Sequence, residues 1–386
     1  MKILFFSYTF APNIGGIESV SAILAEKFAG AGHEVALVTE TEENAQLRRL
    51  ATGRVRPTGG LSRAGSPTPN VQRPIYAVTR KPSFSQLLSL LGRCELVFQN
   101  NISLRSLIPA LLMQKRVIVV HQTWLRNVDD GIGWNNRVKR ALLRFVTNVA
   151  ISQAMRDHIN VPARIINNPY DDAVFRLHPE IARDKEFVFV GRLVCDKGVD
   201  VLLRALVILR TSEANTERPT PNAQRPMAEE ERIEHHNRLQ ADLTIIGVGP
   251  EEGKLRELTH ELGLDRQVTF AGEKSGDELA EVLNRHKIMV VPSRWAEPFG
   301  IVALEGIACG CVVVGSRDGG LREAIGPCGL TFKNGDERDL ADCLKVLLLD
   351  PTRKSAFQSE APVHLAKFRA GGVANAYLQL IKEISH

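Results

Sequence analysis

Two glutamates eight residues apart, Glu297 and Glu305, bracket a predicted helix entrance within the stretch 290–320. A helix that begins near Phe299 has first-turn backbone N–H groups without internal partners, and these groups attract phosphate. Gly300 leaves room for a close approach at this entrance. If the helix spanned both carboxylates, a rise of about 1.5 Å per residue would separate them by roughly 12 Å. Because carboxylates accept hydrogen bonds from hydroxyls, the pattern indicates a ligand shaped sugar–diphosphate–ribose.

Two short apolar segments, 288–291 and 312–314, lie on either side of this entrance. Strands that are apolar throughout are typical of parallel sheets covered on both faces. The order strand, helix, strand therefore predicts a buried parallel βαβ unit, which ends in the turn Asp318-Gly319-Gly320.

The motif Glu297-x7-Glu305, set in Pro-Ser-Arg-Trp-Ala-Glu-Pro-Phe-Gly, resembles the signature of retaining GT-B glycosyltransferases of family 4. A bare Glu-x7-Glu is more often a surface loop with two solvated glutamates. The Pro-Phe-Gly and the apolar strand that follows make the resemblance specific. It covers nearly the whole chain except two polar inserts, and it implies an α/β, GT-B fold of two Rossmann-like domains facing each other across a cleft.

Other positions match motifs of this family, and the resemblance implies their roles. Arg192 and Lys197, in the pattern Gly-Arg-x4-Lys-Gly, would neutralise a departing diphosphate, although either residue alone could be an exposed loop cation. His121 follows a predicted strand and would lie beside the donor sugar, where a purely structural histidine is the usual alternative. The expected catalytic residues are His121, Arg192, Lys197 and Glu297, and the expected donor-binding residues are Gly15, Gly16, Gly247, Gly249, Phe299, Gly300, Ile301 and Glu305.

The reaction implied by the resemblance moves a sugar from a nucleoside-diphosphate donor, of UDP or GDP type, to an acceptor hydroxyl with retention. Retention often uses a carboxylate nucleophile. No family-matched residue has that role, and the resemblance implies instead a front-face displacement assisted by the departing phosphate. The sequence has no Asp-x-Asp motif, and we expect neither a metal nor a cofactor. Cell-surface polysaccharide, lipopolysaccharide or glycolipid synthesis is the expected setting.

The segment Gly247–Gly253 supports a competing hypothesis, because Gly-x-Gly-x3-Gly after a strand is similar to a nicotinamide-binding fingerprint. Pro250 and two acidic residues suit a pyrophosphate poorly, so an NAD-linked oxidoreductase is the less favoured interpretation. A non-catalytic nucleotide-binding protein that keeps the fold for assembly is a third. Stabilisation by UDP or GDP without metal is expected only from the glycosyltransferase.

The length of 386 residues exceeds what one hydrophobic core usually supports, which predicts two domains. We expect domains at 1–170 and 185–361, followed by a helical segment, 362–386, that crosses back onto the first. Residues 47–83 and 211–240 are polar and lack apolar periodicity, which predicts two flexible inserts. No apolar run approaches the ~20 residues needed to span a bilayer.

Charge is distributed unevenly along the chain. Residues 1–170 carry a net charge of +11 and the remainder carries −6. Such a basic half suggests an anionic partner, for which nucleic acid, an anionic membrane surface and a phosphate-bearing acceptor are candidates, and solvated arginines the plain alternative. A basic predicted helix contributes candidate acceptor-side or membrane-side residues, Arg137, Lys139, Arg140 and Arg144.

With the resemblance added, we expect two partners, a nucleotide-sugar donor and an acceptor glycan or lipid-linked glycan. An anionic membrane surface is a further candidate, and nucleic acid is not expected. The expected location is cytoplasmic, with peripheral attachment at the inner face of the plasma membrane left open.

Overall fold

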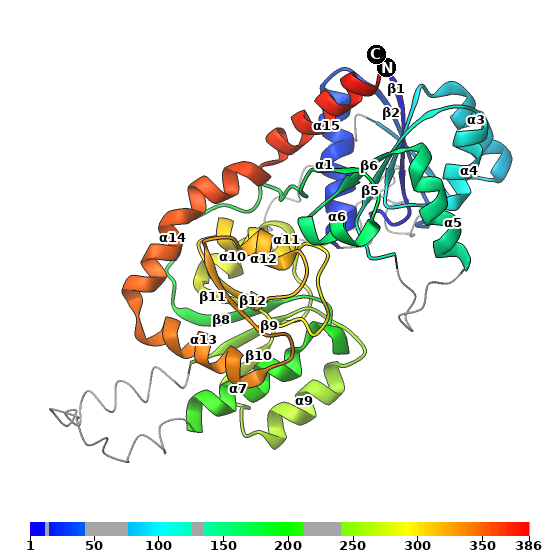
Figure 1. The fold of residues 1–386 in the computed structure, drawn as a ribbon. Helices are drawn as coiled ribbons and strands as arrows, with labels where there is room; N and C mark the ends of the chain where they lie inside the picture. Colours follow the sequence, from blue (N-terminus) through cyan, green and yellow to red (C-terminus); the bar gives the residue numbers. More distant parts are fainter. Residues whose placement is uncertain (12–14, 43–75, 126–133, 212–240, 386) are drawn as a thin grey trace, which may run out of the picture. The chain divides into compact units, whose positions relative to one another are not determined.

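The structure is a computed structural model that describes residues 1–11, 15–42, 76–125, 134–211 and 241–385. These residues form two compact units, each built on one parallel sheet with helices packed against it (Figure 1). The first unit comprises Met1–Ala150, His158–Ile166 and Ala374–His386, and the second comprises Ile151–Asp157 and Asn167–Val373.

The first unit has a seven-stranded sheet in the order β3-β2-β1-β4-β5-β6-β7. Its strands are β1 (Lys2–Ser7), β2 (Glu34–Thr39), β3 (Ala77–Arg80), β4 (Leu96–Asn100), β5 (Arg116–His121), β6 (Thr147–Ala150) and β7 (Ala163–Ile165). Its helical segments are α1 (Gly16–Gly30), α3 (Phe84–Arg93), α4 (Leu104–Leu112), α5 (Trp134–Leu142), η1 (Leu143–Phe145), part of α6 (Gln153–Ile159) and most of α15 (Ala370–Ser385).

The core of the first unit joins the two ends of the chain. The rings of Phe5 and Phe98, on the neighbouring strands β1 and β4, lie 4.8 Å apart. Tyr377 of α15 packs edge-on against Phe98 at 5.4 Å and against Phe28 of α1 at 6.4 Å. Because all four aromatic rings are fully buried, the end of the chain contributes to the hydrophobic core of this unit.

The second unit has a six-stranded sheet in the order β10-β9-β8-β11-β12-β13. Its strands are β8 (Lys185–Val190), β9 (Leu243–Ile246), β10 (Val268–Phe270), β11 (His286–Val291), β12 (Val312–Ser316) and β13 (Gly329–Phe332). Its helical segments are η2 (Cys195–Lys197), α7 (Val199–Thr211), α9 (Glu252–Glu261), α10 (Gly276–Arg285), α11 (Ile301–Ala308), α12 (Leu321–Ile325), α13 (Glu337–Leu349), α14 (Pro351–Leu365) and η3 (Ala366–Phe368).

Both sheets reverse their strand order next to their first strand. In the first unit the chain proceeds outward from β1 through β2 and β3, then returns to the other side of β1 with β4. The second unit repeats this arrangement, with β9 on one side of β8 and β11 on the other. Open parallel sheets bind ligands at the carboxyl ends of the strands that flank such a reversal, so the ends of β8 and β11 mark one expected site.

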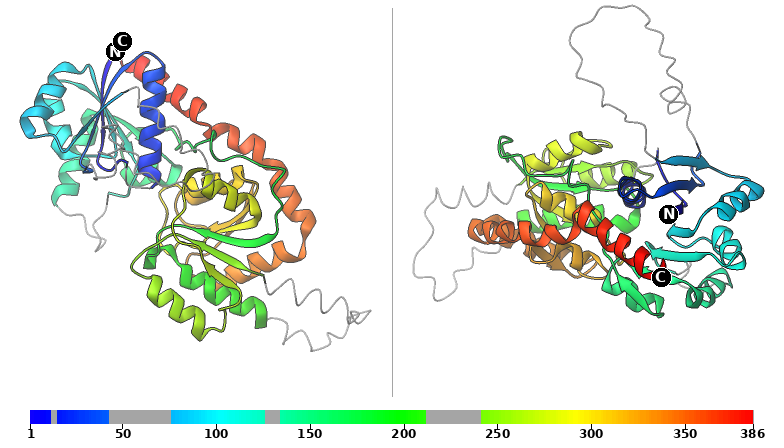
Figure 2. Two further views of the ribbon diagram at one scale, coloured as in Figure 1. Left: turned by 180° about the vertical axis from the view of Figure 1, so that it is seen from behind. Right: turned by 90° about the horizontal axis from the view of Figure 1, so that it is seen from above.

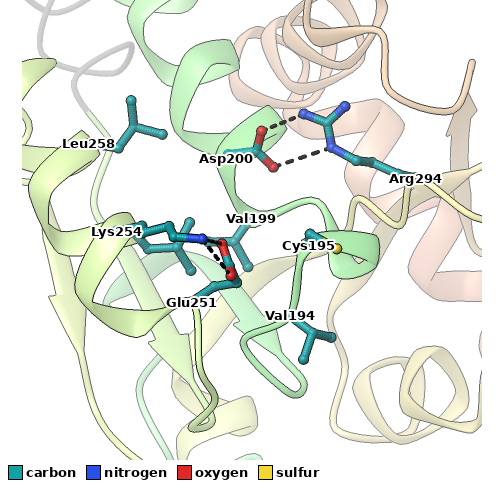
Figure 3. A pocket seen from close by; sticks show the side chains of 9 residues that line it. Val194, Cys195, Val199, Asp200, Glu251, Lys254, Leu258 and Arg294 are labelled. Atoms are coloured by element: carbon teal, nitrogen blue, oxygen red, sulfur yellow. Dashed lines mark hydrogen bonds and ion pairs between the residues drawn. The ribbon is translucent and has the colours of Figure 1, made fainter.

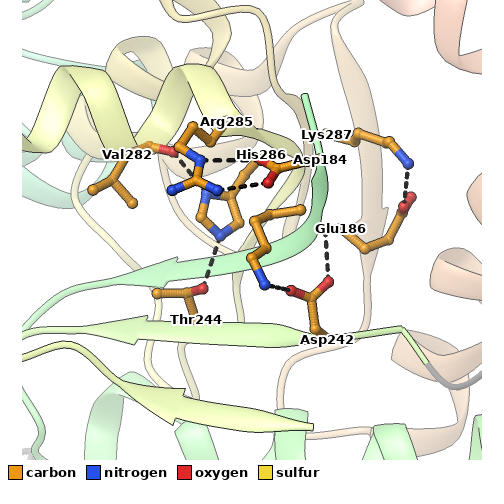
Figure 4. A network of polar contacts seen from close by, with 9 residues as sticks. Asp184, Glu186, Asp242, Thr244, Val282, Arg285, His286 and Lys287 are labelled. Atoms are coloured by element: carbon orange, nitrogen blue, oxygen red, sulfur yellow. Dashed lines mark hydrogen bonds and ion pairs between the residues drawn. The ribbon is translucent and has the colours of Figure 1, made fainter. Parts of the chain in front are cut away.

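The amino edge of the second sheet is held by a network of polar side chains (Figure 4). His286 is buried and bonds through Nδ1 to the Val282 carbonyl at 2.7 Å and through Nε2 to the Thr244 hydroxyl at 2.8 Å. Lys185 Nζ lies 2.8 Å from Asp242, and Lys287 Nζ donates to Glu186 at 2.7 Å. These contacts join the amino ends of β8, β9 and β11, so the polar side chains at this edge stabilise the sheet.

Several predicted boundaries were wrong. Residues 77–80, placed in a polar insert, form the edge strand β3, whose side chains are only half-buried and therefore lack an apolar run. The C-terminal helical segment begins at Pro351, where the Asp350 side chain accepts a hydrogen bond from the Arg353 N–H, so the boundary predicted at residue 362 falls inside α14. Of the two predicted inserts, residues 47–75 and 212–240 lie outside the described residues, and Thr211 is the last residue of α7.

Candidate active site

The carboxyl edge of the second sheet brings together most of the predicted donor-binding and catalytic residues. Arg192 and Lys197 follow β8, Gly247 and Gly249 follow β9, and the segment 297–301 follows β11. Because β9, β8 and β11 are adjacent in the sheet, these three loops lie side by side. Helix α11 begins at Ile301, two residues after Phe299, near which its start was predicted. Glu297 lies in the loop before it, so a helical spacing of roughly 12 Å to Glu305 does not apply.

Glu297 is held by two partners from different loops. Lys197 Nζ donates to its Oε1 at 2.6 Å, and the Ser293 hydroxyl donates to the same oxygen at 2.6 Å. The carboxylate is nearly buried, and its Oε2 has no partner among the described residues. The geometry therefore fixes the carboxylate and leaves one oxygen as an acceptor for a ligand hydroxyl.

The loop that carries Lys197 is tied to the loop that carries Glu297. The Arg294 backbone N–H donates to the Asp196 carbonyl at 2.8 Å, and the Arg294 side chain forms an ion pair with Asp200. Both contacts cross between the segment after β8 and the segment after β11. The Lys197–Glu297 pair is therefore set by the backbone of both loops, which reduces the entropy lost when a ligand binds.

Glu305 lies on α11 and is partly buried. Its carboxylate has no hydrogen-bond partner among the described residues. Burial, with a smaller contribution from the charge of Asp171, raises the pKa of Glu305 to about 7. A desolvated, unpaired carboxylate with a strongly raised pKa is typical of functional sites, because it costs stability that a ligand can restore.

Positive potential at this edge comes from two sources. Arg192 is exposed, and its guanidinium has no partner within the described ranges. The first turn of α11 has no side-chain cap, which leaves backbone N–H groups at the positive end of the helix dipole. Phe299 is buried and its ring lies 5.8 Å from that of Phe368, so only its backbone is available to a ligand.

The glycines after β9 are explained by close packing between two loops. A Cβ on Gly247 would lie 1.9 Å from the Gly191 carbonyl oxygen, and one on Gly249 would lie 2.3 Å from the Leu193 carbonyl oxygen. The Leu193 N–H in turn donates to the Val248 carbonyl at 3.0 Å. Packing against the loop of Arg192 therefore accounts for this Gly-x-Gly without a bound pyrophosphate.

The first unit positions His121, Gly15 and Gly16 at the carboxyl edge of its own sheet. Gly15 caps α1, whose first residue is Gly16, and His121 ends β5. His121 is fully buried, and burial is the main cause that lowers its pKa to about 4, which keeps the ring neutral at physiological pH.

The side chain of Asn148 sets the tautomer of His121. The amide nitrogen of Asn148 donates to the carbonyls of Leu143, Val146 and Pro162 at 2.8, 3.3 and 3.5 Å. Its amide oxygen must therefore accept the 3.1 Å hydrogen bond from His121 Nε2. Nδ1 is then an unprotonated acceptor, and it is buried without a hydrogen-bond partner in the described structure.

The four predicted basic residues of the first unit differ in exposure. Arg137 and Arg144 are exposed, whereas Lys139 and Arg140 are partly buried, with the Arg140 Nε buried and unpaired among the described residues. Arg137, Lys139 and Arg140 lie on α5, and Arg144 lies on η1.

A pocket of about 300 Å3 lies beside the loop of Arg192 and Lys197 (Figure 3). Two ion pairs line it, one between Lys254 and Glu251 at 2.9 Å and the other between Arg294 and Asp200. Cys195 is exposed there. Both cations of this pocket are already paired with carboxylates, whereas Arg192 has no partner among the described residues. We therefore expect a diphosphate to bind at Arg192 and not in this pocket.

Two positioning residues, Ser293 and Asn148, carried no signal in the sequence. Ser293 lies in a loop where no periodicity applies, and Asn148 occupies a strand position that is usually apolar. Among the described residues no cluster of three or more His, Cys, Asp or Glu side chains could hold a metal ion. Likewise, no helix within the described ranges is long and apolar enough to cross a membrane.

Two family profiles together match residues 14–363 of this chain. The profile described as "Glycosyltransferase Family 4" matches residues 14–173, and "Glycosyl transferases group 1" matches residues 174–363. The chain belongs to this glycosyltransferase family. The predicted family and the predicted GT-B fold with two Rossmann-like units are thus confirmed.

Curated relatives of this glycosyltransferase match it over part of their own length. The chain is 36% identical over 209 residues to the D-inositol 3-phosphate glycosyltransferase of Corynebacterium jeikeium, covering 52% of this chain and 44% of the relative. A second such enzyme, from Stackebrandtia nassauensis, is 35% identical and covers 47% and 37% respectively. The match thus spans less than half the length of these curated relatives.

Solved structures resemble this glycosyltransferase over both units. Anabaena HepE in complex with UDP superposes with a TM-score of 0.75 at 16% identity, covering 99% of this chain and 100% of that one. HepE with UDP-glucose gives a TM-score of 0.71 at 17% identity, with the same coverage. WaaG, a glycosyltransferase involved in lipopolysaccharide biosynthesis, gives 0.66 at 15% identity, covering 98% and 99%. At these identities the likeness establishes the fold alone.

Proposed function

We propose that this glycosyltransferase transfers a sugar from a nucleoside-diphosphate donor to an acceptor hydroxyl, with retention at the anomeric carbon. The observation that carries the proposal is the unpaired, partly buried Glu305 carboxylate on the same helix whose N-terminus follows Glu297. Two hydroxyl acceptors thus lie on either side of an anion-binding helix end. A ribose, a diphosphate and a hexose in sequence would satisfy all three features.

In this proposal Glu305 accepts hydrogen bonds from the ribose, and the free Oε2 of Glu297 accepts one from the donor sugar. Arg192 and the first turn of α11 bind the diphosphate, and Gly247 and Gly249 shape the loop beside it. Lys197 shares its charge between Glu297 and the phosphate that departs, so its effect grows as the leaving group becomes charged. Phe299, Gly300 and Ile301 contribute through their backbones.

The residues of the first unit complete the proposal. Gly15 and Gly16 offer the N-terminus of α1 to the diphosphate, and Nδ1 of neutral His121 accepts a hydrogen bond from a substrate hydroxyl. No carboxylate is assigned as a nucleophile, so the departing phosphate assists the attacking hydroxyl on the same face. Charge neutralisation comes from Arg192, Lys197 and helix dipoles, and we propose that the reaction needs no added metal.

The proposal also includes a donor nucleotide and a class of acceptor. UDP is the first nucleotide to test, since HepE was solved with UDP and with UDP-glucose. We propose an acceptor glycan or lipid-linked glycan in cell-surface polysaccharide, lipopolysaccharide or glycolipid synthesis, at the inner face of the plasma membrane. The net charge of +11 on residues 1–170 supports an anionic membrane as a partner of this cytoplasmic enzyme.

UDP is expected to raise the melting temperature of the protein in the presence of EDTA, because the binding site consists of side chains and helix ends. Thermal shift with UDP, GDP and NAD measures this, and slow release of glucose from UDP-glucose measures turnover. No response to UDP and GDP, together with a response to NAD, would reject the proposal in favour of an oxidoreductase. Turnover that EDTA abolishes and Mg²⁺ restores would reject only its metal-free part.

Affinity for UDP-glucose is expected to rise about tenfold between pH 6 and pH 8, because a carboxyl with a pKa of about 7 changes from roughly one-tenth to nine-tenths ionised. In the free protein this raised pKa means that ionisation costs stability as pH increases from 4.5 to about 7. Hydrogen bonds from ribose hydroxyls offset that cost. UDP-glucose has no group that titrates in this range, and His121 stays neutral.

The control is Glu305→Gln, which cannot ionise. This variant should bind UDP-glucose with an affinity nearly independent of pH, and at pH 8 its Kd should be about tenfold higher, from the loss of a charged hydrogen bond of about 1.5–3 kcal/mol. Isothermal titration at several pH values provides both results. An unchanged pH profile in the variant would remove Glu305 from the donor site.

A further inference from the structure

The amino edge of the first sheet gathers three turns that lead into β4, β5 and β6. Leu96, at the start of β4, pairs with Arg116 of β5, and Ile118 of β5 pairs with Thr147 of β6. Phe145, the last residue of η1, precedes Thr147 by two residues, so it lies just before β6, whose neighbour in the sheet is β5. The turns that end α3, α4 and η1 therefore form one continuous edge, which the view from above in Figure 2 faces.

Large apolar side chains project from this edge into solvent. Leu112, at the end of α4, is 80% exposed, Met113 after it is 38% exposed, and Phe145 of η1 is 72% exposed. Buried side chains of the same unit, such as Leu107 and Leu143, lie within five residues of them in the sequence. Exposed apolar side chains that the register brings together mark an interaction surface, whereas single exposed residues are ordinary.

Unpaired cations surround these apolar side chains. Arg93, Arg116 and Arg144 are exposed and have no acidic partner among the described residues. Lys115 bonds only to backbone carbonyls, at 2.8 Å from that of Cys94. The acid in these turns, Glu95, accepts a hydrogen bond from the backbone N–H of Lys2.

Several other cations of this unit have acidic partners. Lys2 pairs with Glu34, Arg105 with Glu40, and Arg164 with Glu383. The sequence from residue 96 to residue 156 contains nine Lys or Arg and two acids, Asp129 and Asp130. Arg93, Lys115, Arg116 and Arg144 differ from these paired cations, because no acidic side chain among the described residues forms an ion pair with them.

We propose that the amino-edge patch, formed by Arg93, Leu112, Met113, Lys115, Arg116, Arg144 and Phe145, docks this protein on an anionic membrane surface. The apolar side chains would enter the boundary between headgroups and acyl chains, and the cations would meet lipid phosphates. A second copy of the chain is a poorer occupant, because a symmetric contact would bring like charges together. This inference assigns a surface of the protein to the membrane partner that the proposed function names. It rests on the proposed function only for the nature of the acceptor.

The test is co-sedimentation of the full chain with phosphatidylcholine vesicles, with and without phosphatidylglycerol. We expect binding only to the anionic vesicles, with release as salt screens the charges. Arg116→Glu/Arg144→Glu should lower the partition coefficient by more than about 25-fold, because each removed cation accounts for about fivefold. Leu112→Ser/Phe145→Ser should lower it by about tenfold, from the apolar area withheld from the bilayer.

Matched controls lie elsewhere on the same unit. Phe84→Ser removes a side chain that is 56% exposed at the start of α3, on the opposite edge, and should leave vesicle binding unchanged. Arg137→Glu/Lys139→Glu tests the α5 face and should have a smaller effect than the two patch arginines. In every variant an unchanged thermal shift by UDP shows that the fold and the donor site are intact.

Three outcomes would contradict the proposal that this patch docks on an anionic membrane. Equal binding to neutral and anionic vesicles, unchanged binding in the patch variants, or loss of binding only in the α5 variant would each do so. A wild-type dimer that Leu112→Ser/Phe145→Ser converts to a monomer, without vesicle binding, would replace the membrane by a second copy. Failure of UDP to stabilise a protein that still binds anionic vesicles would reject the proposed function and leave the patch standing.

Discussion

Lys197→Ala is expected to lower kcat by about 100- to 1000-fold, the usual loss when one preorganised group that stabilises a developing charge is removed. Lys197 touches the acidic Glu297 at 2.6 Å, so the substitution also frees the carboxylate from its charged partner. Glu297 would then keep only the hydrogen bond from Ser293, and its uncompensated charge would repel the departing diphosphate. Turnover of UDP-glucose under saturating donor measures the effect, and Arg192→Ala should behave similarly because Arg192 supplies the other cation after β8.

The matched control is Lys287→Ala, which breaks a comparable ion pair at the opposite edge of the same sheet. Lys287 donates to Glu186 at 2.7 Å, and both pairs are partly exposed. Each substitution should cost about 1–2 kcal/mol of stability, between the values for exposed and buried pairs. Only Lys197→Ala should lose turnover. Equal activity in the two variants, or a loss confined to the acceptor KM, would mean that Lys197 does not serve the leaving group.

The sequence predicted the buried strands better than the edge strand and the exposed helices, for physical reasons. Strands buried on both faces, such as β9 and β11, are continuous apolar runs that stand out from their surroundings. The edge strand β3 is half-buried and sits beside a polar stretch, so no pattern distinguishes it. Helices such as α9, with few buried side chains, were likewise not predicted, because their apolar stripe is narrow.

The residue types of the candidate site were predictable from sequence motifs. The contacts between those residues, which set the geometry of the site, were not. Glu297 and Lys197 are 100 residues apart in sequence, and nothing in either motif indicates that Nζ meets Oε1. The second hydrogen bond to that oxygen, from Ser293, and the role of Asn148 beside His121 depend on the placement of loops and strands. Such contacts follow from the sheet order, which the sequence alone did not provide.

Gly319→Ala is expected to abolish most turnover, about 100-fold or more, through the backbone of Glu297. Gly319 has φ +87°, and a Cβ there would lie 2.3 Å from the Glu297 carbonyl oxygen. The neighbouring Gly320 N–H donates to that same carbonyl at 2.7 Å, so the turn after β12 holds the backbone of the loop that carries Glu297. Relief of the overlap would displace Glu297, and Lys197 and Ser293 would no longer converge on one oxygen.

The control is Gly335→Ala, because Gly335 has a similar φ of +76° but a methyl group at its Cα would meet no atom closer than 3.8 Å. Both substitutions incur a left-handed backbone cost of about 1–2 kcal/mol. Only Gly319→Ala adds a collision with the carbonyl of Glu297, so the difference in turnover, measured at a temperature at which both variants are folded, isolates the position of that carboxylate. Thermal melting and UDP-glucose turnover, measured on both, provide the comparison. If Gly319→Ala kept the turnover of Gly335→Ala, the turn would not position Glu297, and the carboxylate would be held by Lys197 and Ser293 alone.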